Sequence, residues 1–212
     1  DQLFWVGSAG LAQHLPAALR LAPRIAPALP KAARPVLTVV GSMSRHSQAQ
    51  AALLAERSGQ HWQRIEPQLL LAADAADQRE ALSAHLAAQV AAGKDLLISL
   101  EQRDRDPAQA TLLGAPLAQL LLPAIARAGA LIATGGETAR VLLTAAAIDS
   151  LQLHSELAPG VVLSCARHQG RELAIVTKAG GFGQPDTLYQ AWARLHGASH
   201  SQPLSEKEAH HV

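Results

Sequence analysis

The 212-residue sequence contains one cysteine, 3% aromatic residues and no long run of apolar or basic residues. Cys165 alone excludes an internal disulfide framework and a four-cysteine zinc site, and a reducing cytoplasm is the expected location. No apolar run approaches the ~20 residues that cross a bilayer. The formal net charge is only +1, which argues against a nucleic-acid-binding surface.

Two further absences narrow the choice of nucleotide-binding fold. No Gly-Lys-Ser/Thr follows the glycine pairs, so the chain has no Walker A loop. No Gly-x-Gly-x-x-Gly segment opens the first strand–helix unit, which disfavours a Rossmann dinucleotide site.

The composition is that of a folded protein. Apolar residues make up 49% of the chain and charged residues 17%, so a core can form. The abundance of alanine and leucine favours closely packed helices. The length suits one good-sized domain, or one and a half.

Short apolar runs alternate with helical patterns along most of the chain. The expected strands are 3–6, 36–40, 61–65, 95–100, 130–133, 151–157, 161–165 and 172–177, and the expected helices are 11–21, 47–59, 74–92, 107–128, 139–147 and 185–195. This alternation predicts an α/β fold, a mostly parallel sheet flanked by helices. The strands after Leu151 predict a small antiparallel extension near the C-terminus, with Leu151, Leu153, Ser155 and Leu157 on one face.

Prolines indicate a boundary near the N-terminus. Four of them, Pro23, Pro27, Pro30 and Pro35, lie within thirteen residues and favour an extended connector. We expect residues 1–34 to be the end of a preceding unit, or an arm that packs back, followed by a linker. Residues 35–197 would form the main domain and residues 198–212 a flexible tail.

The first motif, Gly135-Gly136-Glu137-Thr138, joins an apolar run to a helical one. A strand, a glycine turn and a helix direct free backbone N–H groups at an anion, and glycine lets a phosphate approach the backbone. Glu137 would repel a phosphate, so it suits a metal ion, a ribose hydroxyl or a neighbouring N–H. The alternative is a tight turn capped by Thr138 or Glu137.

The second motif comes directly after the first strongly predicted strand. Ser42 and Ser44 stand at its carboxyl end, where open parallel sheets bind ligands, and their hydroxyls suit phosphate oxygens. Arg45 would add positive charge. The alternative is helix capping, since Ser47 and Gln50 have capping-box spacing.

The third motif follows the last predicted strand. Gly180, Gly181 and Gly183 place three glycines in four positions, more than one turn requires. Lys178, at the strand end, would reach a phosphate. Asp186 stands near a helix start, where capping is favoured over magnesium binding.

In order and spacing, these three motifs and Pro159-Gly160 resemble the nucleotide-binding C-terminal domain of the four-carbon acid sugar kinases. Residues 6–12 look like the end of that family's N-terminal substrate domain. The resemblance covers residues 3 to about 195. It implies an ATP-dependent transferase of the sugar-acid kinase class that phosphorylates 3-oxo-tetronate, or threonate or erythronate.

The resemblance also implies a site. The nucleotide contacts carried over by position are Ser42, Ser44, Gly135, Gly136, Glu137, Thr138, Gly180 and Gly181. Lys178 is added to them from its place at the strand end, and we expect Glu137 or Asp186 to help place Mg²⁺. The family's substrate domain carries an Asp-Asp-x-Thr-Gly segment that does not occur here. The catalytic base and the sugar-acid contacts are therefore expected from that missing domain.

Two other functions are weighed against the sequence, a non-catalytic fragment and a dehydrogenase domain. The chain could be a non-catalytic fragment that binds a nucleotide or another anion, or supports an oligomer, without turnover. An NAD-binding dehydrogenase domain is disfavoured because its fingerprint is missing. The leucine-rich helices are compatible with a homodimer but do not require one.

Overall fold

The computed structural model describes residues 4–22, 33–42, 44–101 and 107–197. Its strands are β1 (Val36–Val40), β2 (His61–Ile65), β3 (Leu96–Leu100), β4 (Ala130–Thr134), β5 (Gln152–Ala158), β6 (Val161–His168) and β7 (Arg171–Lys178). Its helices are α1 (Ala9–Ala18), α2 (Arg45–Ser58), α3 (Pro67–Leu71), α4 (Ala76–Ala91), α5 (Pro107–Ile125), α6 (Gly136–Ala145) and α7 (Thr187–Leu195), with a short 3₁₀ turn, η1 (Ala73–Ala75), before α4.

The strands form one seven-stranded sheet in the order β2-β3-β1-β4-β7-β6-β5. The first five of these are parallel, and at one side of the sheet β6 pairs antiparallel with both β7 and β5. This confirms the predicted α/β fold and its antiparallel extension. The β6–β7 hairpin turns at Gln169 and Gly170, whose φ values of 50° and 78° suit a tight two-residue turn.

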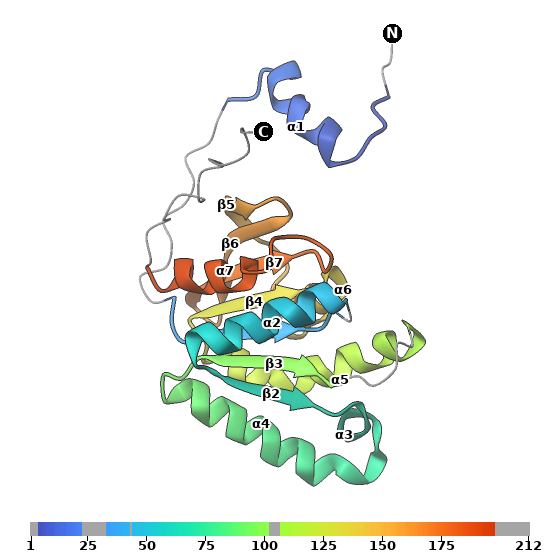
Figure 1. Cartoon of the computed structure of the whole chain (residues 1–212), viewed down its shortest axis with the longest axis vertical. Coiled ribbons are helices and arrows are strands. Elements are labelled where there is room, and N and C mark those ends of the chain that lie inside the picture. The colour runs from blue at the N-terminus through green and yellow to red at the C-terminus, as the bar shows by residue number, and fades with distance from the viewer. Residues whose placement is uncertain (1–3, 23–32, 43, 102–106, 198–212) are drawn as a thin grey trace, which may run out of the picture.

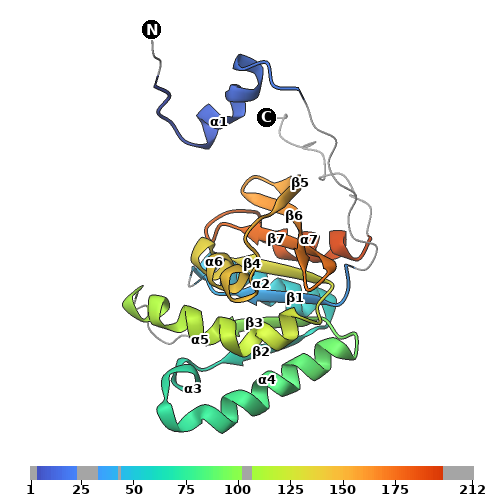
Figure 2. The same cartoon turned by 180° about the vertical axis from the view of Figure 1, so that it is seen from behind.

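Helices cover both faces of the sheet (Figures 1 and 2). Strands β1, β3 and β4 are buried along their whole length, as expected for parallel strands covered on both sides. Because side chains alternate along a strand, Leu37 and Val39 join a core with α4, α5 and α6, while Val36 and Val40 join another with α2 and α7. The sheet thus separates two apolar layers.

The strand predicted over residues 3–6 is wrong where the structure describes it. Residues 4–8 form no strand, and Phe4 and Val6 are 88% and 94% exposed. Both views show this segment and α1 apart from the sheet, so it has no strand to pair with (Figures 1 and 2). Residues 4–6 thus have the apolar composition of a strand, but no neighbouring strand of the sheet pairs with them.

Two local predictions also need correction. Helix α2 is capped by Ser44 rather than Ser47, because the Ser44 hydroxyl accepts a hydrogen bond from the Ser47 N–H at 3.1 Å. The predicted apolar face of β5 is not kept, since Leu153 is 68% exposed and register shifts after Leu153 and Glu156 interrupt the alternation.

Several predictions fall on residues that the structure does not describe. Most of the proline connector, at 23–32, and the tail at 198–212 lie outside the described residues, as do residues 102–106. The proposed domain boundary stays a prediction. Among the described residues, no helix is long and apolar enough to cross a membrane.

Candidate functional site

The sheet has a topological switch point between the neighbouring strands β1 and β4. Helix α2, which follows β1, packs through Ala51 and Leu54 on one face of the sheet. Helix α6, which follows β4, packs through Ala139 and Leu142 on the other face. Open α/β sheets bind ligands in the crevice that such a divergence leaves at the carboxyl ends of the strands.

All three sequence motifs meet at this crevice. Val40, Thr134 and Lys178 lie side by side at the ends of β1, β4 and β7. The segments that follow these strands therefore adjoin one another. The N–H of Gly135 donates to the carbonyl of Lys178 at 2.9 Å, which joins the first and third motifs directly.

Two glycines allow the loops to approach this closely. A Cβ on Gly41 would lie 1.9 Å from Oγ1 of Thr138, and a Cβ on Gly180 would lie 2.5 Å from Oγ of Ser42. Such distances are far below van der Waals contact, so a side chain at either position would push the loops apart. Thr138 and Ser42 thus line the junction of the loops.

The two serines hold the loops together. Ser42 Oγ donates to Ser44 Oγ at 3.2 Å, and Ser44 Oγ donates to the Gly180 carbonyl at 3.0 Å. The hydroxyl of Ser47 donates to the same carbonyl at 2.5 Å. Sequence analysis gave helix capping as the alternative to ligand binding. Ser44 makes that cap, and its hydroxyl also contacts the third motif.

Gly136 and Gly181 differ from the glycines that pack between the loops. A Cβ on either would meet no protein atom within 4 Å. Both residues are exposed, and they belong to the first and third motifs. These positions leave open space that no side chain of the described residues fills.

Glu137 is paired with Arg140 one turn along α6. Glu137 Oε1 lies 2.5 Å from Arg140 Nη2, and Arg140 Nε donates to Oε2 at 2.9 Å. The hydrogen bonds from Arg140 lower the pKa of Glu137, which is therefore ionised at neutral pH. No side chain caps α6 at Gly135, so the alternative of capping by Thr138 or Glu137 is not observed.

Asp186 occupies the N-cap position of α7 but makes no capping hydrogen bond. Its Oδ2 accepts from Gln190 Nε2 at 3.2 Å, so the favoured capping role was wrong. The described residues contain no group of three or more His, Cys, Asp or Glu that could hold a metal ion. Magnesium, however, is often held by one or two carboxylates together with substrate phosphates. Magnesium binding by Glu137 or Asp186 stays a prediction.

Lys178 is 2% exposed and directs its ammonium at the backbone of the third motif. Nζ donates to the carbonyls of Ala179, Gly180 and Phe182 at 2.9, 3.3 and 2.9 Å. An ammonium has three N–H donors, and all three are used here. Burial lowers the pKa of Lys178 below its ordinary value.

Two residues of α2 that the sequence analysis left without a ligand-site role also hold the third motif. His46 Nε2 lies 2.7 Å from the Gly183 carbonyl, and Gln50 Nε2 donates to the Gln184 carbonyl at 2.6 Å. The same His46 nitrogen lies 3.0 Å from Gln50 Nε2, so the two side chains contact each other as well as the third motif. The i, i+4 spacing of two polar residues on the buried side of a helix was the available signal.

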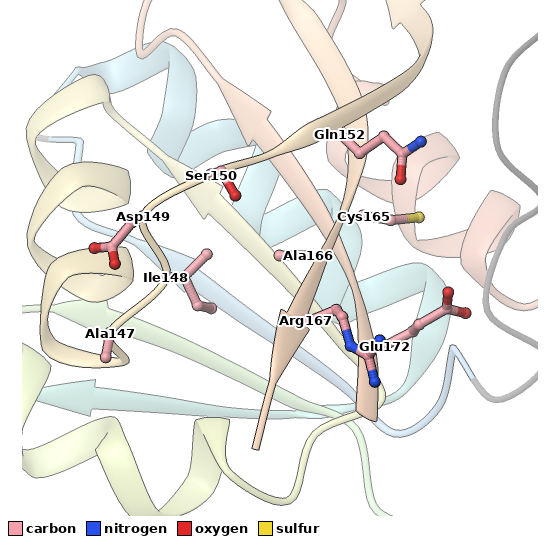
Figure 3. A pocket seen from close by; sticks show the side chains of 9 residues that line it. All are labelled: Ala147, Ile148, Asp149, Ser150, Gln152, Cys165, Ala166, Arg167 and Glu172. Carbon is pink, nitrogen blue, oxygen red and sulfur yellow. The ribbon is translucent and has the colours of Figure 1, made fainter. Parts of the chain in front are cut away.

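A cavity of about 370 Å³ lies away from the crevice and contains none of the predicted site residues (Figure 3). The connection from α6 to β5 and the β6–β7 hairpin line it, through Ala147, Ile148, Asp149, Ser150, Gln152, Cys165, Ala166, Arg167 and Glu172. Cys165, at the end of the expected strand 161–165, is 6% exposed in β6.

We expect Cys165 to react slowly with thiol reagents. Burial, with a smaller contribution from Glu172, raises the pKa of the Cys165 thiol, and the thiolate is the reactive form. The rate with Ellman's reagent at pH 8 should be at least about tenfold lower in the folded chain than in guanidinium. The signal is unambiguous because the chain has one cysteine. Equal rates in both states would contradict this expectation.

Comparison with known proteins gives the family. A family model described as "Nucleotide-binding C-terminal domain" matches residues 37–188. D-threonate kinase from Cupriavidus necator is 43% identical over 198 residues, covering 91% of this chain and 47% of that protein. 3-oxo-tetronate kinase from Pseudomonas fluorescens is 31% identical over 205 residues, covering 90% of this chain and 46% of that protein. The chain thus spans about half the length of these curated relatives.

A solved structure is similar in fold. It is a domain of unknown function from Bordetella bronchiseptica, crystallised with bound citrate as a domain-swapped dimer. It shares 30% identity at a TM-score of 0.61, covering 78% of this chain and 42% of that one. The matched range 37–188 contains all three motifs that meet at the crevice. The chain therefore belongs to the four-carbon acid sugar kinase family, as its nucleotide-binding C-terminal domain.

Proposed function

We propose that the crevice binds ATP with Mg²⁺ and that the chain is the nucleotide-binding part of a kinase for a four-carbon sugar acid. The substrate class, 3-oxo-tetronate or threonate and erythronate, is supported by the names of the relatives. The observation that carries the proposal is the meeting of three glycine- and serine-rich loops at the switch point between β1 and β4.

Phosphoryl transfer depends mainly on positioning and on neutralising phosphate charge. The free N–H groups at the start of α6 and in the third motif would bind phosphate oxygens. Ser42 is the hydroxyl best able to turn toward a ligand, because its present acceptor is another hydroxyl. Glu137 or Asp186 would help to place Mg²⁺, and the pairing with Arg140 offsets the repulsion between Glu137 and a phosphate.

The remaining chemistry would come from a substrate domain. The curated relatives are about twice the length of this chain, and residues 1–34 would be the end of the domain that precedes it in them. That domain would supply the general base and select the acid. The exposed Phe4 and Val6 agree with a segment that packs against something other than this sheet.

Calorimetric titration with a non-hydrolysable ATP analogue, with and without Mg²⁺, tests the proposal. We expect a dissociation constant of about 10 to 100 µM, tighter with Mg²⁺. NADH should bind more weakly than the ATP analogue, which separates the kinase domain from a dehydrogenase domain. No analogue binding to a sample shown to be folded by circular dichroism would overturn the proposal for this chain.

The second candidate, a nucleotide- or anion-binding fragment without turnover, is favoured by the coverage of only 47% and 46% of the relatives. ATP consumption with a panel of four-carbon acids separates the candidates. A fragment binds the analogue without consuming ATP. A catalytic chain consumes ATP with at least one acid of the panel.

A further inference from the structure

Lys178 is a buried cation, and none of the phosphate contacts proposed above involves its side chain. The residue is 2% exposed, and within the described part of the chain its ammonium forms no ion pair with a carboxylate. Burying a charge without a counter-charge is unfavourable. A buried and uncompensated ammonium beneath a glycine-rich loop therefore points to a role in that loop.

The three carbonyls that accept from Lys178 define the orientation of three peptide groups. In a planar trans peptide, the N–H points opposite to the C=O. The carbonyls of Ala179, Gly180 and Phe182 point at Nζ. The N–H groups of the same peptide units, which belong to Gly180, Gly181 and Gly183, therefore point away from the ammonium.

Those N–H groups are available to a ligand. Among the described residues, the N–H groups of Gly180, Gly181 and Gly183 donate to no backbone or side-chain acceptor. The neighbouring N–H groups are occupied, because Phe182 donates to the Ala179 carbonyl and Gln184 to Thr187 Oγ1. The three unoccupied N–H groups belong to the same peptide units as the three carbonyls that accept from Lys178.

The ammonium is not needed to satisfy these carbonyls. Each accepts from a second donor: Ala179 from the Phe182 N–H, Gly180 from Ser44 and Ser47, and Phe182 from Gln50. Removal of the charge would therefore leave no buried carbonyl without a partner. This argues that the ammonium serves the ligand side of the loop rather than hydrogen-bond satisfaction.

We propose that Lys178 is a positioning residue that turns the N–H groups of Gly180, Gly181 and Gly183 toward the crevice to receive a phosphate group. The inference rests on the proposed nucleotide-binding function. Lys178 acts through the loop and does not touch the phosphate, since its three donors are all on carbonyls. Its positive charge lies on the far side of the peptide groups and strengthens the attraction for an anion.

The test replaces Lys178 by methionine, which has a similar length and no N–H donors. We expect affinity of the 212-residue chain for the ATP analogue to fall by about tenfold or more, because the N–H groups are no longer aligned. In the nucleotide-free protein, amide hydrogen exchange at Phe182 and Gln184, whose N–H groups are hydrogen-bonded within the loop, should quicken by about tenfold as the loop loosens. Lys94→Met, at an exposed lysine, is the matched control and should change neither quantity.

The outcomes separate this inference from the function on which it rests. If the unaltered chain binds no analogue, the proposed function fails, whereas the exchange rates still test the hold of Lys178 on the loop. Unchanged affinity in Lys178→Met overturns the inference. Weaker binding with unchanged exchange in the nucleotide-free protein also overturns it, because that pattern indicates direct contact with phosphate. If Lys178→Met does not fold, the same measurements on Lys178→Gln decide, since glutamine keeps two donors without the charge.

Discussion

Valine at both Gly136 and Gly181 should reduce affinity for an ATP analogue by about 100-fold or more while leaving the fold intact. A Cβ at either position meets no protein atom within 4 Å, and neither residue has a positive φ. The Cβ of each valine therefore enters the open space proposed for the phosphates. A bulky group at a close-approach glycine cannot be accommodated when the loops are held by several hydrogen bonds.

Calorimetry gives the affinity, and thermal unfolding monitors the fold. Gly10→Val is the matched control, because a Cβ on Gly10 also meets no atom within 4 Å and Gly10 lies in α1, apart from the sheet. Alanine at Gly136 and Gly181 should give a smaller loss than valine. Wild-type affinity in the folded double valine variant would show that the phosphates do not bind between these loops.

Asp95→Ala should lower the free energy of unfolding by about 3 kcal/mol. The Asp95 carboxylate is only 9% exposed and joins α7 to the sheet at the end opposite the crevice. Oδ1 accepts from the Val36 N–H at 2.8 Å, and Oδ2 accepts from Trp192 Nε1 at 2.9 Å. His196 Nε2 lies 2.8 Å from Oδ2, within reach of an ion pair when the ring is protonated. Alanine would leave the N–H of the buried Val36 and the indole N–H of the half-buried Trp192 without these acceptors.

Urea denaturation measures the change, with Asp149→Ala as a control at an exposed aspartate, expected within about 0.5 kcal/mol of the unaltered chain. Trp192→Phe removes one of the two donors and should cost about 1 kcal/mol. Because Asp95 comes before the amino end of β3, analogue affinity in the folded state should not change. A stability loss below 1 kcal/mol in Asp95→Ala would argue against this anchoring role.

The sequence predicted the elements with strong local signals. Aliphatic runs such as 36–40 and 130–134 are strands because their side chains suit a sheet buried on both faces. Gly59 ends α2 as expected, since its φ of 66° favours glycine. Predictions were wrong where a local pattern had several interpretations, as with the apolar residues near Phe4 and the choice between Ser44 and Ser47 as cap.

The sequence by itself determined the fold class, the antiparallel extension and the three motifs after the strands, because these follow from short-range patterns of glycine, hydroxyl and apolar residues. Only the tertiary structure decided that β1, β4 and β7 are neighbours, which brings the motifs together. It also decided that Lys178 points into the third motif and that His46 and Gln50 hold it from α2. Strand order and side-chain direction depend on contacts between residues far apart in the chain, which no local pattern specifies.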